Sequence, residues 1–124
     1  MPELHIKRAY EPRSSSDGRR ILVDRLWPRG LSKHELEGVQ WLRDVAPSAA
    51  LRKWFGHQPE RWGEFRKRYF DELRSNPAVE TIREALRAGP VTLLYGAKDE
   101  IHNQAVALAE YLGGEAERAR KGER

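Results

Sequence analysis

The chain has 124 residues, a formal net charge of +4 and no cysteine. This length fits one domain that buries its own core, and the lack of thiols excludes disulfides, thiolate nucleophiles and cysteine-based metal sites. The first residues contain no apolar run of the signal-peptide type, and no window is apolar enough to span a membrane. We therefore expect a cytoplasmic domain that does not contact membranes.

Two strands are predicted in the first quarter of the chain. Residues 4–10 alternate apolar and polar side chains, as a half-buried strand does. Proline, three serines and an Asp-Gly pair then indicate a loop. The short apolar run of residues 21–23 predicts a central strand, which Pro28 and Gly30 end.

Two short helices are predicted next. Ser32 and Glu35 have the spacing of a capping box, in which a hydroxyl N-cap is followed three residues later by a glutamate. This spacing predicts a short helix over residues 34–45, interrupted by the glycine at position 38. A second short helix is expected within residues 46–56, ending at Gly56.

The clearest helical pattern covers residues 57–75. Its apolar side chains recur at helical spacing and predict a buried stripe, not a platform for stacking bases: Trp62, Phe65, Tyr69 and Leu73. Asn76-Pro77 predicts the start of a further helix, which Gly89-Pro90 closes.

The last predicted strand is residues 91–95, whose continuous apolar run is typical of an inner strand of a parallel sheet. A final helix is expected between Asp99, as its N-cap, and Gly113-Gly114, as its end. Residues 1–114 would then form one domain, and residues 115–124 a charged, disordered tail.

Strands separated by helical segments predict a single compact α/β domain, with a small, mainly parallel sheet of about three strands covered by about five helices. In such folds ligands bind beyond the carboxyl ends of the strands. Residues 24–33 and residues 96–103 follow the two inner strands, so these two loops are expected to converge if the strands are neighbours.

The two loops carry the candidate site residues. Arginine recognises carboxylate or phosphate through two parallel hydrogen bonds, and lysine adds a point charge. Histidine transfers protons near neutral pH, and an aspartate can orient it. The predicted ligand-binding residues of these loops are Arg25, Arg29, Lys33, Lys98 and Asn103, and the predicted catalytic residues are His102, Asp99 and Asp24.

Simpler roles remain open for several of these residues. Asp99 also fits a plain N-cap, and His102 and Lys98 fit an exposed surface. Arg25 fits a structural ion pair with Asp24 or with a carboxylate elsewhere. Arg52 and His57 lie one turn apart at a junction between two predicted helices and form a second candidate pair for ligand binding. A local cap or a surface histidine is the alternative there.

Other chemistry finds no support in the sequence. The four histidines lack the spacing of metal ligands, and glycine-rich phosphate loops, zinc motifs and nucleophile elbows are absent. We therefore predict no metal and no cofactor.

The sequence resembles the domain of unknown function 488 family, in its short YeaO-like branch. The resemblance covers roughly residues 17–112 and is carried by the strings "DGRRILVDRLWPRGLSK", "WLRDVAPSAALRKWFGH", "FRKRYFDELRSNP" and "VTLLYGAKDEIHNQAVAL". It implies a compact α/β domain and no particular activity. Some longer members of the family carry a Cys-His-Arg element just after the third strand, where this chain has His102 and no cysteine. Any thiol chemistry of those relatives therefore does not transfer.

The pattern of the branch falls on both loops and on the junction between helices. It maps onto Asp24, Arg25, Trp27, Pro28, Arg29, Gly30, Lys33, Pro47, Ser48, Arg52, Phe55, His57, Tyr95, Lys98, Asp99, His102 and Asn103.

Three functions stay open from the sequence. The first is a small domain that binds, or an enzyme that acts on, a phosphorylated or carboxylated ligand such as a nucleotide. The second is a nucleic-acid-binding module that uses the basic segments. The third is a non-catalytic interaction or dimerisation domain. The sequence indicates no oligomeric state.

Overall fold

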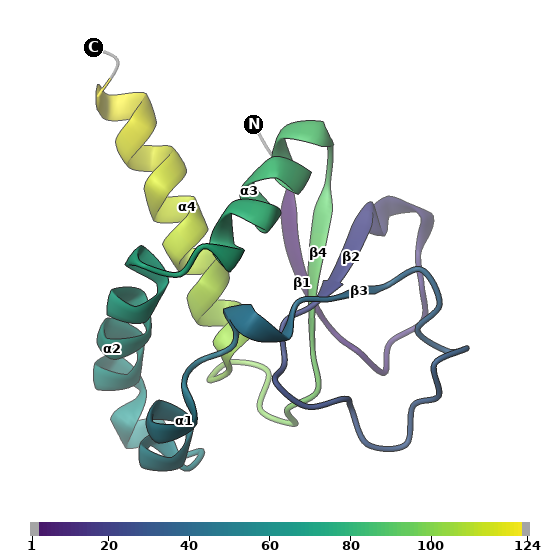
Figure 1. The fold of residues 1–124 in the computed structure, drawn as a ribbon, viewed down its shortest axis with the longest axis horizontal. Helices are drawn as coiled ribbons and strands as arrows, with labels where there is room; N and C mark the ends of the chain where they lie inside the picture. Colours follow the sequence, from purple (N-terminus) through teal and green to yellow (C-terminus); the bar gives the residue numbers. More distant parts are fainter. Residues whose placement is uncertain (1–2, 123–124) are drawn as a thin grey trace.

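The computed structural model describes residues 3–122, which form a parallel sheet with helices on one side (Figure 1). The four strands are β1 (Leu4–Arg8), β2 (Arg19–Leu22), β3 (Gln40–Trp41) and β4 (Val91–Tyr95). Their order is β1-β4-β2-β3, and every pair is parallel. The predicted α/β class is confirmed, and β2 and β4 are the two inner strands, as their apolar runs predicted.

The helices are α1 (Ala49–Phe55), α2 (Trp62–Arg74), α3 (Ala78–Ala88) and α4 (Gln104–Gly122). Three short 3-10 turns accompany them, at Ser15–Asp17, Arg43–Val45 and Pro59–Arg61. The described part of the chain thus has four strands and four α-helices, where the sequence predicted about three and about five.

The two faces of the sheet are covered differently. On one face Ile21 and Leu93 pack against side chains from all four helices. On the other face Leu22 and Leu94 pack against Leu36 and other side chains of the segment between β2 and β3. Figure 1 shows this segment as a long excursion away from the helices. The site described below lies where this excursion begins.

The buried stripe of α2 is confirmed. Phe65, Tyr69 and Leu73 are buried, and Trp62 is half-buried. The Tyr69 hydroxyl donates a hydrogen bond of 2.7 Å to the carbonyl of Val45, so the one polar atom that the stripe takes into the core is satisfied.

The helix predicted over residues 34–45 is wrong. The capping box itself forms, because the Ser32 hydroxyl accepts a hydrogen bond from the Glu35 N–H (3.1 Å) and the Glu35 carboxylate accepts one from the Ser32 N–H (2.9 Å). These bonds close a turn and no helix follows, since Gly38 adopts a left-handed backbone with φ +83°. The chain then extends, and Gln40–Trp41 pairs with β2.

The last helix begins and ends later than predicted. Asp99 precedes it by one turn, and the N-cap is Asn103, whose side-chain oxygen accepts a hydrogen bond of 3.0 Å from the Val106 N–H. At the other end α4 continues past Gly113-Gly114 to Gly122. Gly113 shows no left-handed backbone that would stop a helix. Residues 123–124 of the predicted tail lie outside the described residues.

Candidate functional site

The loops that follow β2 and β4 meet, as the parallel pairing of these strands requires. The Asp24 carboxylate accepts a hydrogen bond of 2.8 Å from the backbone N–H of Gly96 and another from the side-chain amide of Gln104. A Cβ atom on residue 96 would lie 3.0 Å from the Asp24 carboxylate, so glycine permits this close approach. Asp24 therefore ties the end of β2 to the end of β4 and to the start of α4.

Burial changes the acidity of this carboxyl group. It raises the pKa of Asp24 to about 6 from the usual 3.8, while the hydrogen bond from the Gly96 N–H acts in the opposite direction. In the described part of the chain, Asp24 forms no hydrogen bond with His102, whose Nδ1 atom is paired with Asp99 instead.

Two tryptophans fix the loop after β2. The Trp27 indole N–H donates to the carbonyl of Leu31 (2.6 Å), and the Trp41 indole N–H donates to the carbonyl of Asp24 (2.8 Å). The two indole rings meet edge to face with centroids 5.3 Å apart. The Tyr10 hydroxyl donates to the carbonyl of Arg29 (2.7 Å). The arginines of this loop are thus presented from a firmly held backbone.

The loop forms one wall of a hollow of about 460 Å³, which we call the arginine hollow. Its volume lies in the range of small-molecule sites. Its lining residues come from both loops, from the segment after β1, from the region of α1 and from the first position of α4: Tyr10, Asp24, Arg25, Leu26, Trp27, Pro28, Arg29, Ala46, Pro47, Arg52, His57, Gly96, Ala97 and Gln104. Three arginines and one carboxylate therefore face the same space.

These arginines lack acidic partners. Among the described residues, the side chains of Arg25 and Arg29 form no ion pair and no hydrogen bond with protein atoms. The Arg25 Nε atom is buried without a partner. Arg52 donates from Nε to the carbonyl of Pro47 at 3.2 Å and reaches no carboxylate. Buried or crowded guanidinium groups are normally paired, so this hollow has unsatisfied capacity to bind an anion.

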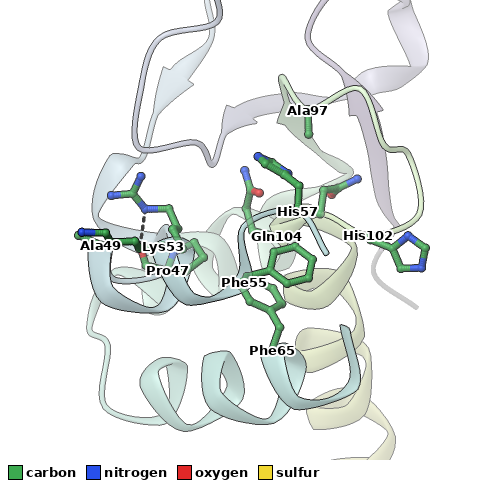
Figure 2. Close-up of a pocket in the computed structure, with 11 residues that line it drawn as sticks. Pro47, Ala49, Lys53, Phe55, His57, Phe65, Ala97, His102 and Gln104 are labelled. Atoms are coloured by element: carbon green, nitrogen blue, oxygen red, sulfur yellow. Dashed lines mark hydrogen bonds between the residues drawn. The ribbon is translucent and has the colours of Figure 1, made fainter. Parts of the chain in front are cut away.

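A second hollow of about 390 Å³ adjoins the first, and we call it the phenyl hollow (Figure 2). It is lined by Pro47, Ala49, Arg52, Lys53, Phe55, His57, Phe65, Ala97, His102, Asn103 and Gln104. Five of these residues also line the arginine hollow: Pro47, Arg52, His57, Ala97 and Gln104. The two hollows therefore share a wall.

His57 is the most unusual residue of that wall. Its backbone is left-handed, with φ +56°, directly after Gly56 with φ +53° at the end of α1. His57 is the one non-glycine residue with positive φ in the described part of the chain. It is exposed, and among the described residues its side chain forms no hydrogen bond. Backbone strain of this kind tends to persist at functional positions.

The structure separates the predicted lysines from the hollows. Lys33 and Lys98 are both exposed and line neither hollow. The simpler reading of Lys98 as a surface residue fits its position. Arg25, Arg29 and Asp24 lie together as predicted, but their partners across the hollow are the second candidate pair, Arg52 and His57.

The predicted pair of His102 and Asp99 exists, on the far side of the phenyl hollow. The Asp99 carboxylate accepts a hydrogen bond of 2.9 Å from the His102 backbone N–H and lies 2.9 Å from its Nδ1 atom. The backbone N–H groups of His102 and Ile101 and the His102 side chain hold the pKa of Asp99 at about 2. The His102 ring packs edge-on against Trp62 (5.4 Å) and points away from the centre of the cavity in Figure 2.

Sequence reasoning missed Gln104, which bonds Asp24 and lines both hollows. The signal was its place directly after the predicted loop, at the first position of α4. Asn103 was predicted to bind ligand. Its side-chain oxygen caps α4 by accepting from the Val106 N–H, and its side-chain N–H donates to the carbonyl of Asp99. Among the described residues, no cluster of histidine and acidic side chains could hold a metal ion, and no helix has the length and apolar character of a membrane span.

Comparison with known proteins gives the family. The sequence profile described as the inactive DUF488-N3 subclade matches residues 3–124. The chain belongs to this family. The resemblance seen in the sequence is thereby confirmed.

Three relatives of this DUF488 chain are described as uncharacterised proteins. An uncharacterised protein of Mycobacterium bovis, Mb3100c, is 39% identical over 111 residues, which are 90% of this chain and 94% of that protein. Protein Rv3073c of Mycobacterium tuberculosis shows the same values. The uncharacterised protein YeaO of Escherichia coli is 40% identical over 110 residues, 88% of this chain and 96% of YeaO. No solved structure matches the chain.

Proposed function

We propose that this protein binds a small anionic ligand in the arginine hollow and does not convert it chemically. The observation that carries the proposal is the convergence of Arg25, Arg29 and Arg52 on one hollow without a carboxylate partner for their guanidinium groups among the described residues. A phosphate or carboxylate group would supply the missing acceptors, and guanidinium groups bind both through paired hydrogen bonds.

The electrostatics of the hollow favour an anion. Asp24 is the one acidic residue in its lining, against three arginines. Both oxygens of Asp24 are already engaged, by Gly96 and Gln104, so this carboxylate does not neutralise the arginines by pairing with them.

Binding is favoured over catalysis for two reasons. Of the predicted catalytic pair, His102 lines the phenyl hollow but not the arginine hollow, and Asp99 lines neither. The family profile that the chain matches is also described as inactive.

A nucleic-acid interface finds less support. On α2, Arg68 pairs with Glu64 (3.0 Å) and Arg66 lies 3.8 Å from Glu110, so part of the positive charge of this basic segment is already offset. The aromatic stripe of α2 faces the core and offers no stacking surface.

Calorimetric titration with sulfate and with inorganic phosphate at low ionic strength tests the proposal. Arg29→Ala removes one exposed guanidinium from the hollow and is expected to weaken sulfate binding about tenfold or more, the effect of losing a charge-assisted hydrogen bond. Lys67→Ala removes the same charge from the exposed side of α2 and should change the affinity less than about twofold.

Lys98→Ala distinguishes binding in the arginine hollow from binding by the set of residues predicted from the sequence. Because Lys98 lines neither hollow, its removal should resemble the Lys67→Ala control. The proposal fails if neither anion binds, or if Arg29→Ala and Lys67→Ala have equal effects.

A further inference from the structure

We infer that the ligand is an organic phosphate with a planar aromatic group, and that this group occupies the phenyl hollow while the phosphate lies in the arginine hollow. The inference rests on the proposed anion binding and adds the chemistry of the rest of the ligand. Nucleoside monophosphates and aryl phosphates share this two-part chemistry.

The shared lining of the two hollows supports one ligand that reaches from one to the other. His57, Ala97 and Gln104 line both spaces, so the two hollows lie directly beside each other. Each hollow alone, at about 390 and 460 Å³, has the size of a site for a small molecule. A compound held by its phosphate in the arginine hollow would therefore have room for a second group in the phenyl hollow.

The lining of the phenyl hollow combines two phenyl rings with six polar or charged side chains: Arg52, Lys53, His57, His102, Asn103 and Gln104. The rings of Phe55 and Phe65 stack with centroids 4.5 Å apart and 29° between their planes. Trp62 stacks on Phe65 with ring centroids 5.6 Å apart. Figure 2 shows the two phenyl rings below His57 and Gln104, with Ala97 on the opposite side. An aromatic group in this space would meet fixed rings, which favour offset or edge-on ring contacts.

His57 lies where the arginine hollow meets the phenyl hollow. Its ring centroid lies 6.2 Å from that of Phe55, and the residue also lines the arginine hollow. An imidazole can donate a hydrogen bond to a phosphate oxygen and pack its face against a ring. The left-handed backbone of His57 places the side chain at this junction, where both parts of such a ligand pass.

The test compares methyl phosphate with phenyl phosphate, two monoesters that differ in the organic group. Calorimetric titration should give an affinity for phenyl phosphate about tenfold or more above that for methyl phosphate. Arg29→Ala should weaken both, because both would use the arginine hollow.

A matched pair of variants tests whether the aromatic group of phenyl phosphate lies in the phenyl hollow. Ala49 is exposed at the start of α1 and lines the phenyl hollow but not the arginine hollow. Its exposed neighbour Ala50 lines neither hollow. Ala49→Trp should narrow the phenyl hollow and reduce the preference for phenyl phosphate, with methyl phosphate binding unchanged. Ala50→Trp should leave both affinities unchanged. The methyl phosphate affinity also reports whether each variant is folded, and Ala49→Leu gives a smaller obstruction at the same position.

The outcomes separate this inference from the proposed function. Equal affinity for the two esters, with both lost in Arg29→Ala, would overturn the inference and leave anion binding standing. A preference for phenyl phosphate that Ala49→Trp and Ala49→Leu do not reduce would also overturn it. Failure of both esters to bind would end both proposals.

Discussion

At the scale of single residues, His57 combines an energetic cost with a position that faces both hollows. A non-glycine residue in the left-handed region costs about 1 kcal/mol relative to a regular conformation, and glycine avoids this cost. Among the described residues, the side chain of His57 forms no hydrogen bond that would offset this cost. If the residue is kept for ligand binding, stability and affinity should respond in opposite directions to its removal.

Replacing His57 by glycine tests whether this residue lowers stability while it raises ligand affinity. We expect the free energy of unfolding of His57→Gly to be unchanged or to rise by up to about 1 kcal/mol, because relief of strain offsets the added freedom of the unfolded chain. Sulfate affinity should fall at the same time. Urea denaturation and calorimetry measure the two quantities.

His34→Gly is the control for this experiment. His34 is also exposed and lies in a turn, but its φ is not positive, so glycine should cost about 0.5–1 kcal/mol there and leave sulfate binding intact. A loss of stability in His57→Gly as large as that in His34→Gly would count against strain at position 57.

At the scale of elements, the start of β2 depends on one close approach at the end of the sheet away from the site. Gly18 has φ +65°, and a Cβ atom there would lie 2.2 Å from the carbonyl oxygen of Pro90. The same carbonyl accepts a hydrogen bond of 2.9 Å from the Arg19 N–H, which sets β2 beside β4. The Thr92 hydroxyl adds a buried hydrogen bond of 2.7 Å to the carbonyl of Asp17.

Gly18→Ala should therefore lower the free energy of unfolding by about 2 kcal/mol or more, through backbone strain and steric overlap with Pro90. Gly63→Ala is its counterpart, since no atom lies within 4 Å of a Cβ there and the residue is helical. That change should be neutral or stabilising by up to about 1 kcal/mol. Urea denaturation distinguishes the two, and equal effects would contradict the role given to Gly18. Sulfate affinity of the folded Gly18→Ala protein should stay unchanged, because the hollows lie at the other end of the strands.

At the scale of the whole molecule, periodicity predicted the elements that bury one continuous face. The α/β class, the inner strands and the stripe of α2 all follow from apolar spacing that burial enforces. The prediction of a helix over residues 34–45 was wrong because a local capping box was taken as the start of a helix. The left-handed Gly38 and the pairing of Gln40–Trp41 with β2 decide its structure, and pairing between distant residues is not visible locally.

The candidate site was predicted in part for the same reason. Parallel pairing of β2 and β4 brings their following loops together, so Asp24, Arg25 and Arg29 could be placed at one edge of the sheet. The direction of each side chain could not be derived from the sequence. Lys33 and Lys98 are therefore outside the hollows, whereas the path of α1 brings Arg52 and His57 in.

Asp24 links this edge of the sheet to the stability of the entire chain, because its carboxylate joins β2, the segment after β4 and α4. Its pKa is raised to about 6 in the folded protein from 3.8, so the folded state binds a proton more tightly than the unfolded state. This group therefore stabilises the fold below about pH 4, and that contribution is lost as the pH rises from about 4 to 6. The lowered pKa values of Asp17 and Asp99 act in the opposite sense, in more acidic solution.

Asp24→Asn should remove this dependence on pH. Between pH 4.5 and pH 7.5 we expect the wild-type protein to lose about 1–2 kcal/mol of unfolding free energy relative to the variant, less than the full pKa difference implies because the carboxylate is partly solvated. Urea denaturation of both proteins at the two pH values measures the difference, and groups common to both cancel in the comparison. Asp71→Asn, which changes an exposed carboxylate paired with Arg74, should follow the wild type. If Asp24→Asn also follows the wild type across this range, the Asp24 carboxyl group is not the source of the pH dependence.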